Sequence, residues 1–170
     1  MRVLNQKGFT LIEIVISLVL VGVVAAVVGM SSYHMVKSFL FSGKNVDTLL
    51  KGQIAIARIT KELNNVKKVY VADTNDKQIK FTSYRDTVDH TLSWAGSGTN
   101  LLLNGTILTD KVSVFRLDYY DNYTGSGTSS TWLATSRIIE VNLELTGAEN
   151  TTTKFNARVV PSFDVTLIGP

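Results

Sequence analysis

The feature that most constrains this chain is an apolar stretch close to its N-terminus. Residues 14–30 read IVISLVLVGVVAAVVGM and include seventeen positions without a charge, and counting from Phe9 gives twenty-two residues. At about 1.5 Å of rise per residue, a helix of the longer length crosses the roughly 30 Å hydrocarbon layer of a membrane. No apolar run of this length follows Ser31. We therefore expect at most one membrane-spanning helix, over residues 9–30.

Composition excludes several classes of function. The formal net charge is +3, of which Arg2 and Lys7 supply two units, so the chain after residue 8 carries only +1. No dense cluster of Lys and Arg follows, which argues against nucleic acid as a partner. The chain has no cysteine. A disulfide framework, a CxxC redox pair and a thiolate metal site are therefore excluded.

Residues 1–30 are compatible with more than one kind of targeting segment. A secretory signal peptide could be cut near residues 23–25, but its apolar core would contain Glu13 and would continue past the cut. A plain signal anchor with Arg2 and Lys7 in the cytoplasm is physically sound, yet it leaves Glu13 unexplained. The position of this carboxylate distinguishes these interpretations from a third.

The third interpretation depends on the residues KGFTLIE, from Lys7 to Glu13. They resemble the class III signal of the type IV pilin and pseudopilin family. This resemblance implies that a membrane-embedded prepilin peptidase cuts between Gly8 and Phe9 and then N-methylates Phe9. Residues 1–8 would be the removed leader, and its basic residues are Arg2 and Lys7.

In this family, a carboxylate at the position of Glu13 is held to pair with the N-terminal amine of a neighbouring subunit. Cutting would convert the uncharged amide nitrogen of Phe9 into a cationic amine four residues before Glu13, on the same helical face. An unpaired carboxylate among apolar helices is costly, so Glu13 is the predicted docking residue. Alternatively, Glu13 lies at the headgroup boundary and reaches water.

The helix is expected to continue beyond the membrane to about Asn65, because no proline occurs from residue 33 to 68. Apolar residues recur three or four positions apart, which predicts one apolar face packed on a domain. Gly43 and Gly52 should weaken the helix locally. The apolar positions are Met35, Val36, Phe39, Leu40, Val46, Leu49, Leu50, Ile54, Ala57 and Leu63.

After residue 66, polar and apolar residues alternate, as in strands with one buried face. Asn104-Gly105 is a strong signal for a tight hairpin, and residues 121–131 (DNYTGSGTSST) predict an exposed loop. About eight antiparallel strands are expected, including 68–72, 78–84, 91–95, 100–103, 106–108, 111–120, 137–145 and 154–160.

The predicted fold class is therefore α+β: a pilin fold whose long N-terminal helix packs on a C-terminal antiparallel sheet domain. The predicted segments are the leader (1–8), the transmembrane helix (9–30), its amphipathic continuation (31–66) and a globular domain (67–170). The order of RITKEL, IKF, LLLNG and VSVFRLDYY is similar to that in PilW-type minor pilins and J-type minor pseudopilins of type II secretion. This resemblance implies a minor subunit that primes or caps filament assembly.

Other candidate sites are weaker. His34 and His90 lack spaced zinc-ligand partners and are expected on the surface or at an interface. Asp118, with Asp121 and Asn122, could offer oxygens to calcium, but the spacing is not that of an EF-hand. Aromatic residues around the 121–131 loop would form a contact surface for a partner, or Tyr119 or Tyr120 would enter the core while the others cover the loop. These aromatic residues are Tyr119, Tyr120, Tyr123 and Trp132.

We therefore expect a structural subunit, not an enzyme, with no cofactor and no metal. Its expected location is the inner membrane, crossed once, with the C-terminal domain periplasmic or extracellular. The implied partners are prepilin peptidase/N-methyltransferase, other pilin or pseudopilin subunits, an inner-membrane assembly platform and membrane lipid. A major pilin and a signal-anchored periplasmic binding domain are the alternatives. The sequence does not distinguish a type IV pilus from a type II secretion pseudopilus.

Overall fold

The computed structural model describes residues 8–122, 128–161 and 166–168. One long helix, α1 (Leu11–Asn64), precedes strands that form two sheets, so the α+β prediction is confirmed. The chain divides into two compact units, Met1–Gly43 and Lys44–Pro170, and the boundary falls inside α1.

The end of α1 agrees with the sequence prediction to within one residue. After Asn64, the amide side chain of Asn65 donates to the carbonyl of Lys61 over 2.8 Å, and its backbone N–H donates to the carbonyl of Glu62 over 3.1 Å. These bonds satisfy carbonyl groups that the last helical turn leaves without partners. The chain then enters the first strand at Val66.

The first sheet has six strands in the order β10-β1-β2-β3-β4-β5. The hairpin predicted at Asn104-Gly105 is confirmed, because β4 and β5 pair antiparallel. The strand pairs β1–β2 and β3–β4 are also antiparallel. An additional strand, β10, pairs parallel with β1 and corrects the expectation of an entirely antiparallel arrangement. The strands are β1 (Val66–Tyr70), β2 (Gln78–Ser83), β3 (Asp89–Trp94), β4 (Leu101–Leu103), β5 (Thr106–Thr109) and β10 (Thr166–Ile168).

The second sheet has four antiparallel strands in the order β7-β6-β8-β9. The three long strands predicted near the C-terminus are β6 (Val112–Tyr120), β8 (Ile138–Thr146) and β9 (Thr152–Val159). A short strand, β7 (Thr128–Ser129), pairs with the end of β6 inside the segment expected to be a loop. Residues 123–127 of that segment lie outside the described residues. The chain therefore has ten described strands in two sheets, where about eight were expected.

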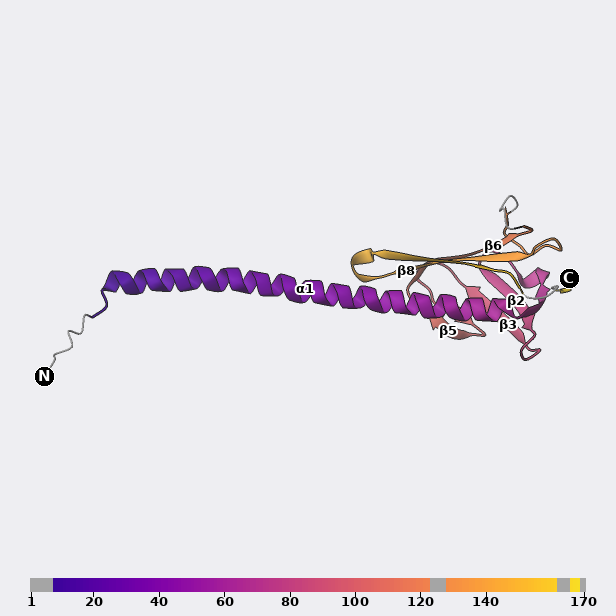
Figure 1. Ribbon diagram of the computed structural model, residues 1–170, viewed down its shortest axis with the longest axis horizontal. Coiled ribbons are helices and arrows are strands. Elements are labelled where there is room, and N and C mark those ends of the chain that lie inside the picture. Colours follow the sequence, from indigo (N-terminus) through magenta and orange to yellow (C-terminus); the bar gives the residue numbers. More distant parts are fainter. Residues whose placement is uncertain (1–7, 123–127, 162–165, 169–170) are drawn as a thin grey trace. The chain divides into compact units, whose positions relative to one another are not determined.

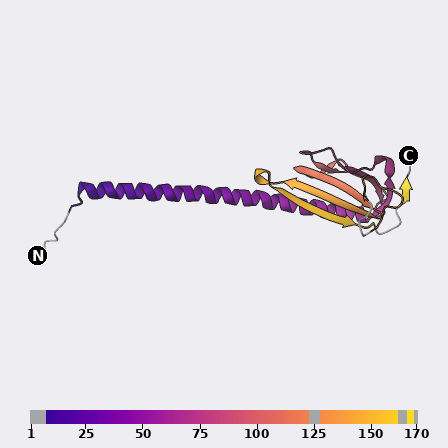
Figure 2. The same ribbon diagram turned by 90° about the horizontal axis from the view of Figure 1, so that it is seen from above.

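Both sheets share one hydrophobic core with the last turns of α1. Ala55, Ile59 and Leu63 of the helix belong to the same buried cluster as Phe81 of the six-stranded sheet and Phe115 of the four-stranded sheet. Figures 1 and 2 both show the strands gathered along the C-terminal part of α1. This arrangement gives residues 44–170 a core of their own.

The face of α1 that packs on this core is not the predicted one. Val46, Leu49, Leu50 and Ile54 are 40–67% exposed, and only Leu63 of the predicted stripe within residues 44–64 is buried. At about 100° per residue, the exposed set and the buried set lie on opposite sides of the helix. The buried residues are Thr48, Gly52, Ala55, Ile59, Glu62 and Leu63.

Gly52 explains the choice of this face. The ring of Phe155 in β9 lies so close to the Gly52 backbone that an added Cβ would collide with it. Gly52 and Ala55 let the helix backbone approach the four-stranded sheet closely. Bulky aliphatic residues at those positions would hold the two elements apart, because protein interiors are close-packed.

Candidate functional site

The bond predicted to be cut lies just before α1. Gly8 and Phe9 are exposed and outside the helix, which begins at Leu11. The side chain of Phe9 is 82% exposed, and a Cβ added to Gly8 would meet no atom within 4 Å. The peptide bond between them is therefore part of an accessible, non-helical segment. Arg2 and Lys7 lie outside the described residues.

Glu13 and Thr10 form a capping box at the start of α1. The backbone N–H of Thr10 donates to Glu13 Oε2 over 3.3 Å, and the N–H of Glu13 lies 3.4 Å from Thr10 Oγ1. Such reciprocal bonds satisfy N–H groups that a helix start leaves free. Sequence reasoning missed this contact, although the required T-x-x-E pattern is present in TLIE. Glu13 therefore has a local structural role in the uncut chain.

The same carboxylate suits the chemistry that cutting would produce. A helix N-terminus carries a partial positive charge, so a cationic amine placed there is unfavourable. Cutting after Gly8 would create that amine at Phe9, two residues before Leu11. Glu13, in the first turn of α1, supplies the opposite charge. The charge of Glu13 is therefore opposite to that of the amine that cutting would create.

The first unit offers an apolar surface to its surroundings. All residues from Leu11 to Met30 are exposed, and α1 contains a window of mean hydropathy 3.0 with none of it buried. By length and composition, this part of the helix could cross a membrane. The hydroxyl of Ser17 donates to the carbonyl of Glu13 over 2.7 Å, which satisfies a polar group within the helix. The small residues Gly22 and Gly29 leave open space beside the helix.

The two histidines differ in environment. His34 is exposed and makes an edge contact with Tyr33. The prediction of a surface or interfacial position is wrong for His90, which is 7% exposed. Its Nε2 lies 3.0 Å from Asp86 Oδ2, and its Nδ1 lies 2.8 Å from Asn104 Nδ2.

The contacts of Asn104 identify the proton position on His90. Because Asn104 Oδ1 accepts from the Thr91 backbone N–H over 2.9 Å, its Nδ2 is the donor to His90 Nδ1. The Nε2 of His90 is then the donor to Asp86. This hydrogen bond from His90, with one from the Val88 N–H, lowers the pKa of the Asp86 carboxyl. His90 therefore ties β3 to the 104–105 turn as a structural group.

The aromatic residues near the 121–131 loop contribute mainly to the core. Tyr119 and Trp132 are each 1% exposed and meet edge to face, with ring centroids 5.7 Å apart. The Tyr119 hydroxyl donates to the carbonyl of Asn75 over 3.2 Å. The core alternative is thus confirmed for Tyr119, and the contact-surface hypothesis is wrong for Tyr119 and Trp132. Tyr123 lies outside the described residues.

The carboxylate considered for calcium is already engaged by protein groups. Asp118 Oδ2 accepts from Arg116 Nε over 2.9 Å and from Asn142 Nδ2 over 3.1 Å. Asp121 and Asn122 are exposed. Within residues 8–122, 128–161 and 166–168, no group of three His, Cys, Asp or Glu side chains is arranged to hold a metal ion.

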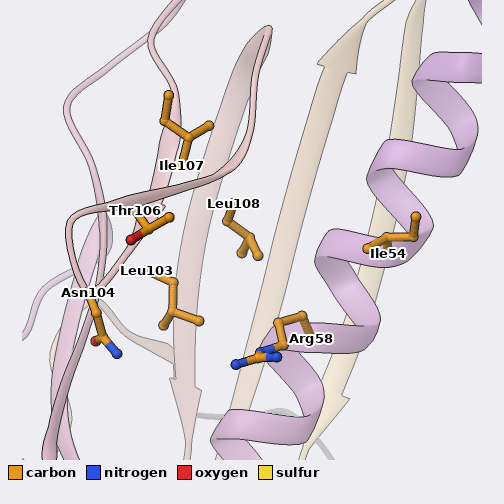
Figure 3. A pocket seen from close by; sticks show the side chains of 7 residues that line it. All are labelled: Ile54, Arg58, Leu103, Asn104, Thr106, Ile107 and Leu108. Atoms are coloured by element: carbon orange, nitrogen blue, oxygen red, sulfur yellow. The ribbon is translucent and has the colours of Figure 1, made fainter.

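A groove in the second unit was not predicted from the sequence. Its volume is about 460 Å³, and α1 forms one side of it while the β4–β5 hairpin forms the other (Figure 3). The Asn104-Gly105 signal predicted this hairpin, but no sequence pattern placed it beside α1. The lining residues are Ile54, Arg58, Leu103, Asn104, Thr106, Ile107 and Leu108.

Comparison with protein-family models gives a match at the N-terminus. Residues 4–29 match the family model described as the prokaryotic N-terminal methylation motif. Comparison with curated proteins and with solved structures found no match. The matched segment contains the Gly8–Phe9 bond, Glu13 and most of the apolar stretch. The match supports a type IV pilin-like precursor, which implies processing by prepilin peptidase and assembly with other pilin subunits. This family is structural rather than enzymatic, and its signal and apolar helix fit an inner-membrane anchor.

Proposed function

We propose that this chain is a minor pilin or pseudopilin that primes or caps a type IV pilus or a type II secretion pseudopilus. The observation that carries this proposal is the methylation-motif match over residues 4–29, on a segment that is also long and apolar enough to cross a membrane. The loose similarity of the later strands to PilW-type and J-type subunits favours a minor role.

In this proposal, prepilin peptidase removes residues 1–8, whose basic residues are Arg2 and Lys7, and methylates the new amine of Phe9. Residues 9–30 cross the inner membrane before assembly, and residues 31–66 continue the helix into a periplasmic or extracellular domain formed by residues 67–170. The assembly platform would then move the subunit into the filament. The accessible, non-helical position of Gly8 and Phe9 supports this order of events.

The two faces of α1 within residues 44–64 also support a role in assembly. Small and apolar side chains on one face pack on the chain's own sheets. On the opposite face, Val46, Leu49 and Leu50 remain at least 40% exposed. A row of exposed aliphatic residues is costly in water and suits contact with other helices. In a filament, neighbouring subunits would cover this face.

The first test is Gly8→Ala in cells that contain prepilin peptidase. We expect the substitution to block cutting, because the motif places glycine immediately before the scissile bond. Mass spectrometry of the N-terminus should find methylated Phe9 in the wild type and an uncut leader in the variant. A wild-type chain that keeps its leader in the presence of the peptidase would refute the proposal.

The second test separates the charge of Glu13 from its capping role. Glu13→Gln can keep the capping box, since glutamine also accepts the Thr10 N–H, whereas Glu13→Ala loses both functions. If the charge docks with an amine, both variants should be cut normally but enter filaments poorly. If only Glu13→Ala is impaired, the residue acts as a helix cap and the docking role is wrong.

A major pilin is the competing assignment within the same family. It predicts that this chain dominates the mass of filaments sheared from cells, whereas a priming or capping subunit should be scarce there. A signal-anchored binding domain predicts that Gly8→Ala changes neither processing nor function.

A further inference from the structure

We propose that the groove between α1 and the β4–β5 hairpin binds an extended peptide segment of a partner protein. The segment would place an aliphatic side chain against the apolar wall and a carboxylate against Arg58. This inference uses only residues of the second unit and does not depend on filament assembly.

The walls of the groove are largely aliphatic and incompletely covered. Ile54 of α1 is 67% exposed and Ile107 of β5 is 59% exposed. Leu103 and Leu108 are half-buried and also pack against the core, so they form a fixed surface rather than a mobile one. The volume of about 460 Å³ lies within the range of ligand-binding clefts. One or two aliphatic side chains of a partner would remove this surface from water.

The charge of the groove indicates that the ligand has a carboxylate next to its aliphatic side chain. Arg58 is its one charged lining residue among the described residues, and the groove wall contains no carboxylate. The guanidinium extends from α1 toward the hairpin (Figure 3). Its Nε lies 3.0 Å from Oε1 of the buried Glu62, and the Arg58 side chain is 48% exposed. An arginine has five N–H donors, so its outer nitrogens can bind a second carboxylate.

Glu62 lies at ion-pair distance from Arg58, but its buried Oε1 has no hydrogen-bond partner among the described residues. The Glu62 side chain is 3% exposed, and Nη2 of Arg85 also lies within 3.7 Å of the same carboxylate oxygen. Glu62 therefore has a second cation outside the groove lining. Because Oε1 of Glu62 accepts no hydrogen bond from the described residues, Arg58 can turn its outer nitrogens toward a ligand without breaking one.

The backbone of β5 indicates that the ligand is extended. β5 is the last strand of the six-stranded order, and its described residues pair only with β4. Asn104 and Gly105 both have positive φ, 55° and 76°, as in a two-residue type I′ turn that closes with the Leu103–Thr106 pair. In an antiparallel ladder, the next residue, Ile107, then directs its N–H and C=O away from β4.

The edge at β5 also lacks the usual protection against pairing. Its residues, TILT, include no charge and no proline. In contrast, the β9 edge of the other sheet carries Lys154 and Arg158, which are paired with Glu144 and Glu140. Charged residues on an edge strand discourage the addition of another strand. A register shift next to Leu108 limits the pairing surface of β5 to a short stretch, so binding should be weak without the Arg58 contact.

The test uses the full chain in phosphatidylcholine nanodiscs, with ¹³C-labelled isoleucine and leucine methyl groups. Two peptides are titrated: Ac-Thr-Leu-Asp-Val-Thr-NH2 and the same peptide with Asn in place of Asp. We expect the Asp peptide to shift the methyl signals of Ile54 and Ile107 with a Kd near 1 mM. The Asn peptide should bind about tenfold more weakly, since it loses a charge-assisted contact.

Matched variants test whether Arg58 causes the preference for the Asp peptide over the Asn peptide. Arg58→Gln should bind both peptides equally, whereas Arg85→Gln should keep the preference, because Arg85 shares Glu62 but does not line the groove. Ile107→Ser should weaken both peptides. A thermal melt of each variant shows whether the fold is retained, and Ile107→Ser on the exposed edge tests the proposal even if Arg58→Gln unfolds.

Several outcomes would overturn the proposal. The first is that the Asp peptide causes no methyl shifts up to about 10 mM. The second is that the wild type binds the two peptides with equal affinity. The third is that Arg58→Gln still binds the Asp peptide more tightly than the Asn peptide. Shifts produced by sodium laurate but not by the peptide would assign the groove to a fatty-acid carboxylate. Shifts that follow protein concentration without peptide would assign it to a second copy of this chain.

Discussion

Gly52 shows how one absent side chain determines a packing face. The ring of Phe155 occupies the space where a Cβ would be, and Phe155 itself packs against the core. In an exposed helix, glycine costs up to about 1 kcal/mol relative to alanine. At this position the glycine is required, because its lack of a Cβ admits the ring.

We expect Gly52→Ala to destabilise the second unit by about 1–2 kcal/mol, since overpacking outweighs the gain in helix propensity. Gly43→Ala is the matched control in the same helix, because an added Cβ there meets no atom within 4 Å. It should leave stability unchanged or raise it slightly. Chemical unfolding followed by the fluorescence of Trp94 and Trp132 measures both changes.

A double substitution distinguishes the ring contact from a general helix effect. Combining Gly52→Ala with Phe155→Leu removes the atoms that would collide, so the combined cost should be smaller than the sum of the single costs. Strictly additive costs would show that Phe155 is not the obstacle.

Tyr119 gives the protein a specific sensitivity to alkali. Burial, and then the nearby charges of Asp76 and Asp118, raise the pKa of the Tyr119 phenol above its usual value of about 10. The folded chain therefore keeps the phenol protonated where the unfolded chain would release the proton. The contribution of this proton to the free energy of unfolding is complete below about pH 10. As the pH rises further, the free energy of unfolding falls by at most about 1.4 kcal/mol per pH unit.

The expected result is that Tyr119→Phe flattens the loss of stability above about pH 10. At pH 7 the variant should be about 1 kcal/mol less stable, because it lacks the hydrogen bond to the carbonyl of Asn75. Urea unfolding at a series of pH values measures the difference between the two proteins. If that difference stays constant from pH 8 to about 11, the titration of Tyr119 is not responsible.

At the scale of elements, the β4–β5 hairpin contains a tight turn and a residue, Asn104, whose side chain hydrogen-bonds to β3. Asn104 and Gly105 supply the positive φ angles of the turn. The Asn104 side chain also bonds the Thr91 backbone and the ring of His90 in β3. The same short segment therefore shapes one hairpin and connects it to the next strand.

Two substitutions separate these contributions. Asn104→Gly keeps a turn that tolerates positive φ but removes both side-chain bonds, and should cost about 1–2 kcal/mol. Gly105→Ala keeps the bonds but strains a residue at φ 76°, and should cost about 1 kcal/mol. Only Asn104→Gly should change the ¹⁵N shift of His90 Nδ1. An unchanged ¹⁵N shift of His90 Nδ1 in Asn104→Gly would contradict the hydrogen bond from Asn104 to His90.

Most elements could be predicted because their signals are local. Alternation identified β6, β8 and β9, and Asn104-Gly105 identified the β4–β5 hairpin. β7 and β10 were missed because strands of two or three residues have no readable period, and they form only where a neighbouring edge accepts them. The Thr10–Glu13 capping box had a local signal in the sequence and was still overlooked.

At the scale of the whole molecule, the described core belongs entirely to the second unit. The buried apolar residues run from Ala55 to Val159, whereas residues 11–40 are exposed throughout. The two units therefore depend on different surroundings. The first exposes an apolar helix that could cross a membrane by length and composition, and the second buries its own apolar core.

This division predicts that a chain beginning at Lys44 folds in water without detergent. It should unfold cooperatively with a melting temperature close to that of the full chain in nanodiscs, because the same core is lost in both. Trp132, which is 1% exposed, should show blue-shifted fluorescence until unfolding. A broad transition, or exposed Trp132 fluorescence at room temperature, would show that residues 1–43 are needed for this core.

The sequence by itself determined the long helix, its end near Asn64, the membrane-length stretch and the hairpin order, because each depends on residues close together in the chain. The motif from Lys7 to Glu13 likewise showed a resemblance to the class III signal without any structure, and the methylation-motif match over residues 4–29 supports it. Only the tertiary structure decided which face of α1 is buried, where His90 and Trp132 lie, and that a groove forms beside Arg58. Apolar residues occur on both faces of α1, and packing chose the face with Gly52 because only a small residue admits the Phe155 ring.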